Sequence, residues 1–192
     1  MSPVTHFLTG WLVANIPDDL SRRDRAIITL AGVAPDLDGL GIVAELLTRR
    51  SKNPLLWWSE YHHVAGHNLG FGLVVAFVAF LLAIRRWEAA GLALLSFHLH
   101  LLEDLAGSRG PDGDQWPIPY LLPFSHRWEW TWGGQWELNA WPNFVVMGAA
   151  LALTFYLAWR RGRSPLEMFS RSADKAFVEA LRRRFPRPES AE

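Results

Sequence analysis

The sequence predicts an all-α protein: a small membrane-embedded helical bundle of about four or five helices, followed by an amphipathic C-terminal helix. Two uncharged apolar stretches, 69–84 and 142–159, approach the roughly 17–25 residues that a membrane-spanning helix needs. Each is followed directly by a pair of arginines. Tryptophan occurs 11 times in 192 residues, and this residue is typical of membrane interfaces.

The other elements follow from the same pattern of apolar stretches and polar breaks. Shorter apolar helices are expected at 6–16 and 26–35, and residues 39–61 make an excursion that begins and ends on one side of the membrane. A further helix, 89–105, returns the chain, and a loop with six tryptophans, 106–141, leads to the helix at 142–159. We expect residues 1–163 to form the membrane-embedded domain.

The C-terminal segment 164–192 is predicted to be a cytoplasmic, basic, amphipathic tail. Phe169, Phe177, Leu181 and Phe185 recur at helical spacing beside basic residues, which is typical of a helix lying on an anionic leaflet. A solvated tail without membrane contact is the alternative.

The distribution of basic residues predicts the orientation. The loops at 22–25, 85–86 and 160–192 hold 14 of the 19 lysines and arginines, so the positive-inside rule places them in the cytoplasm. We expect a multi-pass protein of the plasma (inner) membrane. The N-terminus lacks the basic region of a signal peptide, so no cleavage is expected.

Composition excludes several classes of protein. The 19 basic and 19 acidic residues balance, so we expect no nucleic-acid partner. The absence of cysteine excludes disulfides, thiolate zinc sites and thiol nucleophiles. Eight tryptophans fall on the predicted non-cytoplasmic side, where they form an interfacial belt or line a groove for an amphiphile; both interpretations remain open. They are Trp57, Trp58, Trp116, Trp128, Trp130, Trp132, Trp136 and Trp141.

Imidazoles and carboxylates meet at that same non-cytoplasmic end. Each has an ordinary explanation alone, such as a helix cap, an ion pair or a core histidine. Their alignment at one end of several helices instead indicates a metal site, because ionisable groups at membrane depth are costly and usually functional. The residues are His6, Asp36, Asp38, His62, His67, His100 and Asp104.

Imidazole and carboxylate ligands without thiolates suit zinc, with manganese as the alternative. Seven such ligands exceed one tetrahedral site, so two or three ions are possible. A two-metal centre suits phosphoryl transfer. Asp36 or Asp38 is expected to bridge metals or act as general base, and Arg109 is expected to hold a phosphate. His126 and Glu129 are weaker candidates, and His98, on another face of its helix, is expected to be a core histidine.

The order of five motifs adds a resemblance. "HFLTGWLVA", "APDLD", "HHVAGH", "HLLED" and "YLLPFS", spread over about residues 6–125, resemble the YdjM-like family of membrane-bound metal-dependent hydrolases. That family is distantly similar to zinc-dependent phospholipase C and the zinc single-strand nucleases. The resemblance implies that the seven histidines and aspartates named above hold the metal.

One motif departs from the family pattern. The usual His-Arg-x-x-Thr-His-Ser is replaced by "HHVAGHN", residues 62–68, which keeps both histidines and loses the arginine, threonine and serine. We expect His63 or Arg109 to take the place of the arginine. Otherwise the substrate differs from that of the family.

The expected function is metal-dependent hydrolysis of a phosphoester in a lipid or lipid-linked substrate by metal-activated water, with the bilayer as partner. The tryptophan loop is expected to seat the acyl or prenyl chain. A non-catalytic protein that binds lipid or metal is one alternative, and a b-type haem protein or an ion-coupled transporter is another. Crowding of the histidines beside aspartates at one end argues against haem, and the lack of acids near the midplane argues against a transporter.

Overall fold

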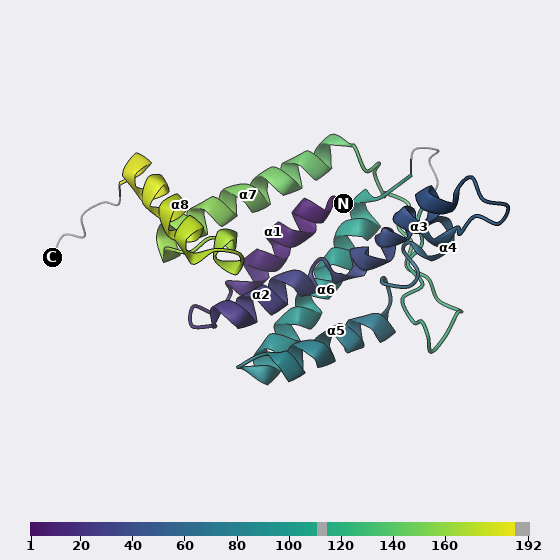
Figure 1. Ribbon diagram of the computed structural model, residues 1–192, viewed down its shortest axis with the longest axis horizontal. Coiled ribbons are helices and arrows are strands. Elements are labelled where there is room, and N and C mark those ends of the chain that lie inside the picture. Colours follow the sequence, from purple (N-terminus) through teal and green to yellow (C-terminus); the bar gives the residue numbers. More distant parts are fainter. Residues whose placement is uncertain (111–114, 187–192) are drawn as a thin grey trace.

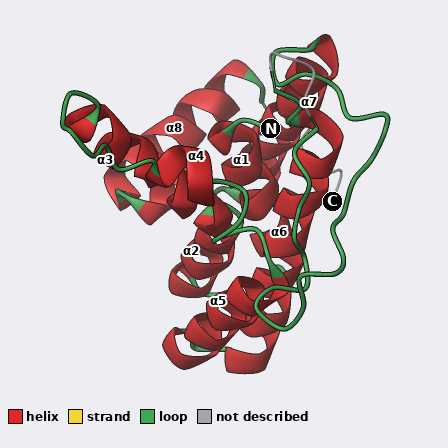
Figure 2. Cartoon of the chain, turned by 90° about the vertical axis from the view of Figure 1, so that its right-hand side faces the viewer, coloured by secondary structure: helices red, strands yellow, loops and turns green. Residues whose placement is uncertain are grey.

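The computed structural model describes residues 1–110 and 115–186 and confirms the all-α class. Helices and loops make up these residues, with no strand among them (Figure 2). Two isolated bridges, Arg109 with Glu137 and Ile118 with Trp130, tie the long loop together. The last residues of the predicted tail, 187–192, lie outside the described part.

Each expected helix is present with slightly shifted ends. The elements are α1 Pro3–Ala14, α2 Arg22–Ala31, the 3-10 helix η1 Ala34–Leu40, α3 Gly41–Thr48, α4 Trp57–Tyr61, α5 Leu69–Leu82, α6 Arg86–Gly107, α7 Trp141–Arg161, the 3-10 helix η2 Pro165–Met168, and α8 Arg171–Arg184.

Local sequence explains several of the helix ends. The side chains of Ser2, Ser21 and Asn68 accept hydrogen bonds from the first turns of α1, α2 and α5, which satisfies backbone donors there. Pro35 has no backbone N–H to donate to the Ala31 carbonyl, so α2 stops and the chain continues as η1. Gly162 ends α7 with a φ of 73°, a conformation that glycine adopts without steric cost.

The helices α1, α2, α5, α6 and α7 form a bundle, as Figure 1 shows. The short helices α3 and α4 lie at one end of this bundle with the long loop, and α8 lies at the other end (Figure 1). The loop folds back onto the bundle, because the carbonyls of Tyr120 and Leu122 accept hydrogen bonds from the backbone N–H groups of Leu69 and Gly70 at 2.7 and 3.0 Å. The "YLLPFS" motif thereby holds the start of α5.

Small residues bring three helices into close contact. A Cβ placed on Gly10 would lie 2.7 Å from the Thr29 carbonyl oxygen, and one on Gly32 would lie 3.0 Å from the His6 carbonyl oxygen. Ser96 of α6 approaches both glycines, with its Oγ at 3.0 and 2.7 Å from these Cβ positions. Such small side chains let helix backbones approach closely. This contact fixes α1, the end of α2 and α6 relative to one another.

The expectation of four or five membrane helices is corrected. In the described residues, α6 with 22 residues and α7 with 21 are long and apolar enough to cross a membrane. A third crossing arises if α2 and the segment Ala34–Thr48, bent by 54°, count as one broken span. At 1.5 Å per residue α1 and α5 reach only about 18 and 21 Å, short of a hydrocarbon core of about 30 Å. The apolar stretches in the sequence included residues that cap or flank these helices.

Polar anchors hold the opposite end of the bundle. The buried Asp24 carboxylate accepts hydrogen bonds from the backbone N–H groups of Ile84 and Arg85 at the turn between α5 and α6. Arg25 forms a buried ion pair with Glu167 of η2 at 2.6 Å. The segment that follows α7 is therefore packed against the bundle at η2, while Phe169 and Phe185 remain exposed.

Candidate metal centre

Four predicted ligands come together from three parts of the chain. His6 of α1, Asp36 of η1, and His100 and Asp104 of α6 each offer a ligand atom, and these atoms lie within 4.8 Å of one another. His6, His100 and Asp104 are buried, whereas Asp36 is half-buried. A second group with the same spacing consists of His63, His67 and Asp104. Asp104 belongs to both groups.

Three imidazole nitrogens converge on the Asp104 carboxylate. The Nε2 atoms of His100 and His67 lie 3.1 and 3.3 Å from its Oδ2, and Nε2 of His6 lies 3.2 Å from its Oδ1. The sequence places His100 and Asp104 one helical turn apart, so both side chains leave the same face of α6. The amino group of Met1 and the Ser108 hydroxyl also donate to Oδ1 of Asp104.

The opposite ring nitrogen of each of these histidines is held by an acceptor. His6 Nδ1 donates to Glu103 at 2.6 Å, and the Thr9 hydroxyl donates to the other oxygen of that carboxylate. His100 Nδ1 donates to the Gly32 carbonyl at 2.8 Å, at the break between α2 and η1. His67 Nδ1 donates to Asp38 at 3.1 Å. Metal-binding histidines are typically fixed by such partners, which leave Nε2 free to bind the ion.

The residues fit a divalent cation. Within the described chain, His6 Nε2 and Asp36 Oδ2 are buried and form no hydrogen bond; the approach of His6 Nε2 to Asp104 at 3.2 Å lacks hydrogen-bond geometry. The Nε2 atoms of His67 and His100 face each other at 3.1 Å, although each Nδ1 already has an acceptor. An ion bound to nitrogen and oxygen would satisfy these atoms, and this combination of ligands suits zinc or manganese.

Asp38 and His62 belong to neither ligand group of the described residues, although the resemblance implies a ligand role for them. Asp38 accepts hydrogen bonds from His62 Nδ1 at 2.9 Å and from the Gly66 backbone N–H at 2.9 Å, besides that from His67. His62 stacks on Trp58 with ring centroids 3.8 Å apart. Asp38 therefore orients the 62–67 loop toward the centre.

The sequence reasoning did not include His63 or Glu103 among the ligands or their supports. His63 has a φ of 64°, and its ring stacks on that of His67 at 4.4 Å. The sequence feature that could have indicated His63 is its position in "HHVAGHN", where the motif that this segment resembles has arginine. Glu103 was visible beside Asp104, but nothing in the sequence predicted that its partner is His6, 97 residues away.

Burial and charge affect the loop histidines differently. Burial disfavours protonation of His67, but its hydrogen bonds with Asp104 and Asp38 outweigh this effect and raise its pKa to about 9. Burial, together with the neighbouring His67, lowers the pKa of His63 to about 2. The two histidines thus shift in opposite directions, because of the two only His67 is hydrogen-bonded to carboxylates in the described structure.

The remaining candidates lie elsewhere. The Arg109 guanidinium donates to the Gly133 carbonyl at 3.3 Å, and Arg109 does not line the pocket over the centre in the described part of the chain. His126 and Glu129 are exposed on the tryptophan loop and belong to neither described ligand group. His98 bonds to the Leu94 carbonyl and the Tyr120 hydroxyl, as expected for a core histidine.

A pocket of about 330 Å³ opens over the centre. Asp36, His62, His63 and Asp104 supply polar groups to it. Trp58, Trp116, Leu40 and Leu138 are among its apolar walls. Two of the tryptophans that were assigned to a belt or a groove thus lie directly at the candidate centre.

The comparisons with known proteins identify the family. The family profile described as "YdjM inner membrane protein" matches residues 1–169. No curated protein and no solved structure matches the chain. The match covers most of the chain, including both ligand groups, so the protein is a member of the YdjM inner membrane protein family.

Proposed function

We propose that this protein is a membrane-bound, metal-dependent hydrolase that cleaves a phosphoester in a lipid or lipid-linked substrate. The observation that carries the proposal is the convergence of three imidazole nitrogens on Asp104 beside the half-buried Asp36, at the base of an open pocket. A divalent cation, zinc or manganese, would supply activated water and neutralise phosphate charge at such a site.

The protein's own residues have distinct roles in this proposal. His6, His100 and Asp104 hold the ion, with Glu103 and the Gly32 carbonyl fixing the two imidazoles. Asp36 lines the pocket and keeps its Oδ2 without a hydrogen-bond partner among the described residues, so it can accept a proton from the attacking water. Arg109, expected from the sequence to hold a phosphate, does not line this pocket among the described residues, so the proposal assigns it no role in this step.

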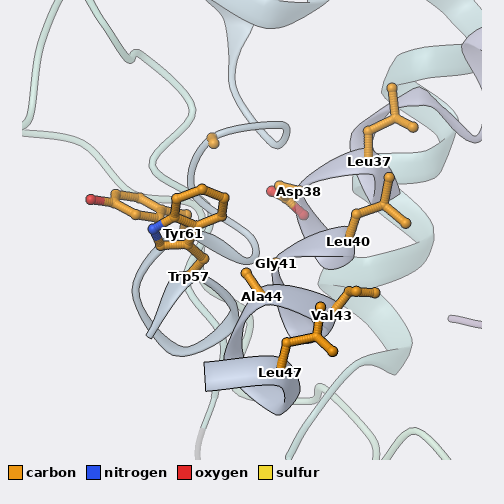
Figure 3. Close-up of a pocket in the computed structure, with 10 residues that line it drawn as sticks. Leu37, Asp38, Leu40, Gly41, Val43, Ala44, Leu47, Trp57 and Tyr61 are labelled. Carbon is orange, nitrogen blue, oxygen red and sulfur yellow. The ribbon is translucent and has the colours of Figure 1, made fainter. Parts of the chain in front are cut away.

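An apolar groove beside the centre supports an amphiphilic substrate. It encloses about 590 Å³ between η1, α3 and α4. Figure 3 shows Trp57 and Tyr61 on one side of it and Leu40, Val43 and Leu47 on the other, with Asp38 between them. Leu40 also lines the pocket over the centre, so the groove and the pocket adjoin.

The surroundings of the groove suit a hydrocarbon chain. None of the residues of α3 is buried within the described structure, and Leu47 is 82% exposed. A contiguous apolar surface of this kind marks a membrane or ligand contact. We therefore assign the acyl or prenyl chain of the substrate to this groove. The sequence alone had suggested that the tryptophan loop holds that chain.

Placement in the membrane completes the proposal. The family indicates the inner membrane. The start of α2, the turn between α5 and α6 and the end of α7, where Arg22, Arg85 and Arg161 occur in the sequence, lie at the end of the bundle away from α3 and α4 (Figure 1). Under the positive-inside rule the centre then faces the non-cytoplasmic side.

The direct test is hydrolysis by detergent-purified protein loaded with zinc or manganese. The substrates are vesicles of phosphatidylglycerol, of phosphatidylethanolamine, and of either lipid with a polyprenyl diphosphate. Mass spectrometry of lipids and released head groups measures cleavage. We expect cleavage that chelation abolishes and that His100→Ala lacks, whereas His98→Ala, two residues away on the same helix, retains it.

Two results would overturn the proposal. One is metal-loaded protein that cleaves none of these lipids. The other is His100→Ala protein that cleaves them at the parent rate.

A further inference from the structure

The ring of His63 lies in the second ligand group, where it packs against other rings but leaves one nitrogen without a hydrogen bond among the described residues. The residue is 7% exposed, and its Nδ1 is buried with no hydrogen-bond partner anywhere in residues 1–110 or 115–186. Trp116 contacts one side of the ring at 4.4 Å, and His67 stacks on it at the same centroid distance. Burying an imidazole nitrogen without a partner costs free energy, so such an atom calls for a ligand.

The backbone of His63 also adopts an uncommon conformation to place the ring there. Its φ of 64° lies in the left-handed region, and His63 is the non-glycine residue with positive φ in the described chain. Side chains pay a steric cost in this region, and such conformations concentrate at functional sites. The loop conformation thus directs the side chain inward, toward Asp104, instead of into solvent.

We propose that His63, His67 and Asp104 bind a second divalent cation, adjacent to the ion held by His6 and His100, with Asp104 shared by both. Each of the three residues offers a ligand atom within 4.8 Å of the others. Asp38 supports this second site from behind by fixing His67 and the Gly66 backbone. This inference rests on the metal centre of the proposed function.

His63 lines the pocket over the centre together with Asp36 and Asp104. A cation bound to it would therefore place positive charge at the wall of this pocket, where that charge can attract a phosphate.

The test is metal content per chain, measured by inductively coupled plasma mass spectrometry after loading with zinc and removal of free ion. His63→Gly removes the imidazole while keeping a residue that tolerates positive φ. His126→Gly, at an exposed loop position, is the matched control. A zinc competition titration measures the affinity of each site, and circular dichroism checks that the helices are retained.

We expect about two zinc ions per chain in the parent and in His126→Gly, and about one in His63→Gly. Adding His100→Ala to His63→Gly should remove the remaining ion. Two equivalents of unchanged affinity in His63→Gly overturn the inference. One equivalent in the parent that His63→Gly leaves intact also overturns it, while the first metal site of the proposed function stands. A parent that binds no ion overturns both.

Discussion

The Nε2 atoms of His67 and His100 face each other at 3.1 Å, although the two residues come from different elements. His67 precedes α5, and His100 lies near the end of α6. Each ring is oriented by an acceptor at its other nitrogen, Asp38 for His67 and the Gly32 carbonyl for His100. Histidines that are already oriented can bind an ion without reorganisation. Loss of a ligand should therefore reduce zinc affinity more than loss of a residue that orients a ligand.

Asp104 and Asp38 provide the first comparison. Asp104→Asn removes the carboxylate charge shared by both ligand groups, so we expect zinc binding to be lost at micromolar concentrations. Asp38→Asn leaves the ligands in place and weakens the support of His67 and of the loop that carries it, so affinity should fall roughly 10–100-fold. Competition titration with a zinc chelator measures both. Equal losses in the two variants would contradict the assignment of Asp38 to a supporting role.

Gly66 tests whether the histidine loop must approach η1 closely. A Cβ at this position would lie 2.2 Å from the Pro35 carbonyl oxygen, so Gly66→Ala has to move the loop away from Asp36 and Asp38. We expect reduced zinc affinity and a loss of roughly 1–3 kcal/mol of stability, as for other overpacked sites.

Gly91→Ala serves as the control for Gly66→Ala. A Cβ at Gly91 meets no atom of the described residues within 4 Å, and the site lies within α6. Alanine there should keep zinc affinity and raise stability slightly, because glycine disfavours helix interiors. Thermal denaturation in detergent, followed by circular dichroism, separates the two variants. Parent-like zinc affinity in Gly66→Ala would refute the close-approach argument.

Sequence reasoning predicted most of the helices and much of the centre, for physical reasons that can be traced. The stretch 142–159 is uniformly apolar, so α7 was found within two residues of its ends. His100 and Asp104 share a helical face, so their joint orientation followed from spacing alone. These are local properties, and local properties are what periodicity reveals.

The predictions that depended on tertiary contacts were less accurate. The number of spanning helices was overestimated because short apolar helices were counted as crossings, whereas α1 and α5, with 12 and 14 residues, are too short to cross a hydrocarbon core of about 30 Å. The different roles of Asp38 and Asp104 depend on which carboxylate the folded loop reaches. Likewise, the inward position of His63 requires a positive φ that no spacing rule indicates.

Gly10 tests how the crossing of α1 and α2 supports the metal centre. A Cβ on Gly10 would lie 2.7 Å from the Thr29 carbonyl oxygen, which is backbone and cannot rotate away. We expect Gly10→Ala to lower stability by roughly 1–3 kcal/mol and to displace His6, one turn earlier in α1. Gly148→Ala in α7 is the control, since its Cβ meets no described atom within 4 Å. Thermal denaturation measures stability, and zinc titration measures the affinity of the metal site. A Gly10→Ala protein with the stability and the zinc affinity of the parent would contradict the expectation.

Arg25 and Glu167 test whether the segment after α7 is held to the bundle by a buried ion pair. Their side chains are only 7% and 10% exposed, and two hydrogen bonds at 2.6 and 2.9 Å join the guanidinium to the carboxylate. Arg25→Met leaves Glu167 charged and buried, so we expect a loss of roughly 3–5 kcal/mol of stability. Arg25→Met combined with Glu167→Leu should recover most of this loss, because no unpaired charge remains.

The same pair separates anchoring from catalysis. It joins the first half of α2 to the segment between α7 and α8, and α8 lies at the end of the bundle away from α3 and α4 (Figure 1). The double variant should therefore keep the zinc stoichiometry of the parent, while the single variant loses stability. Limited proteolysis measures release of the segment: cleavage after α7 should accelerate in Arg25→Met and return to the parent rate in the double variant. An Arg25→Met protein as stable and as protease-resistant as the parent would mean that the helical contacts of η2 and α8 hold this segment without the ion pair.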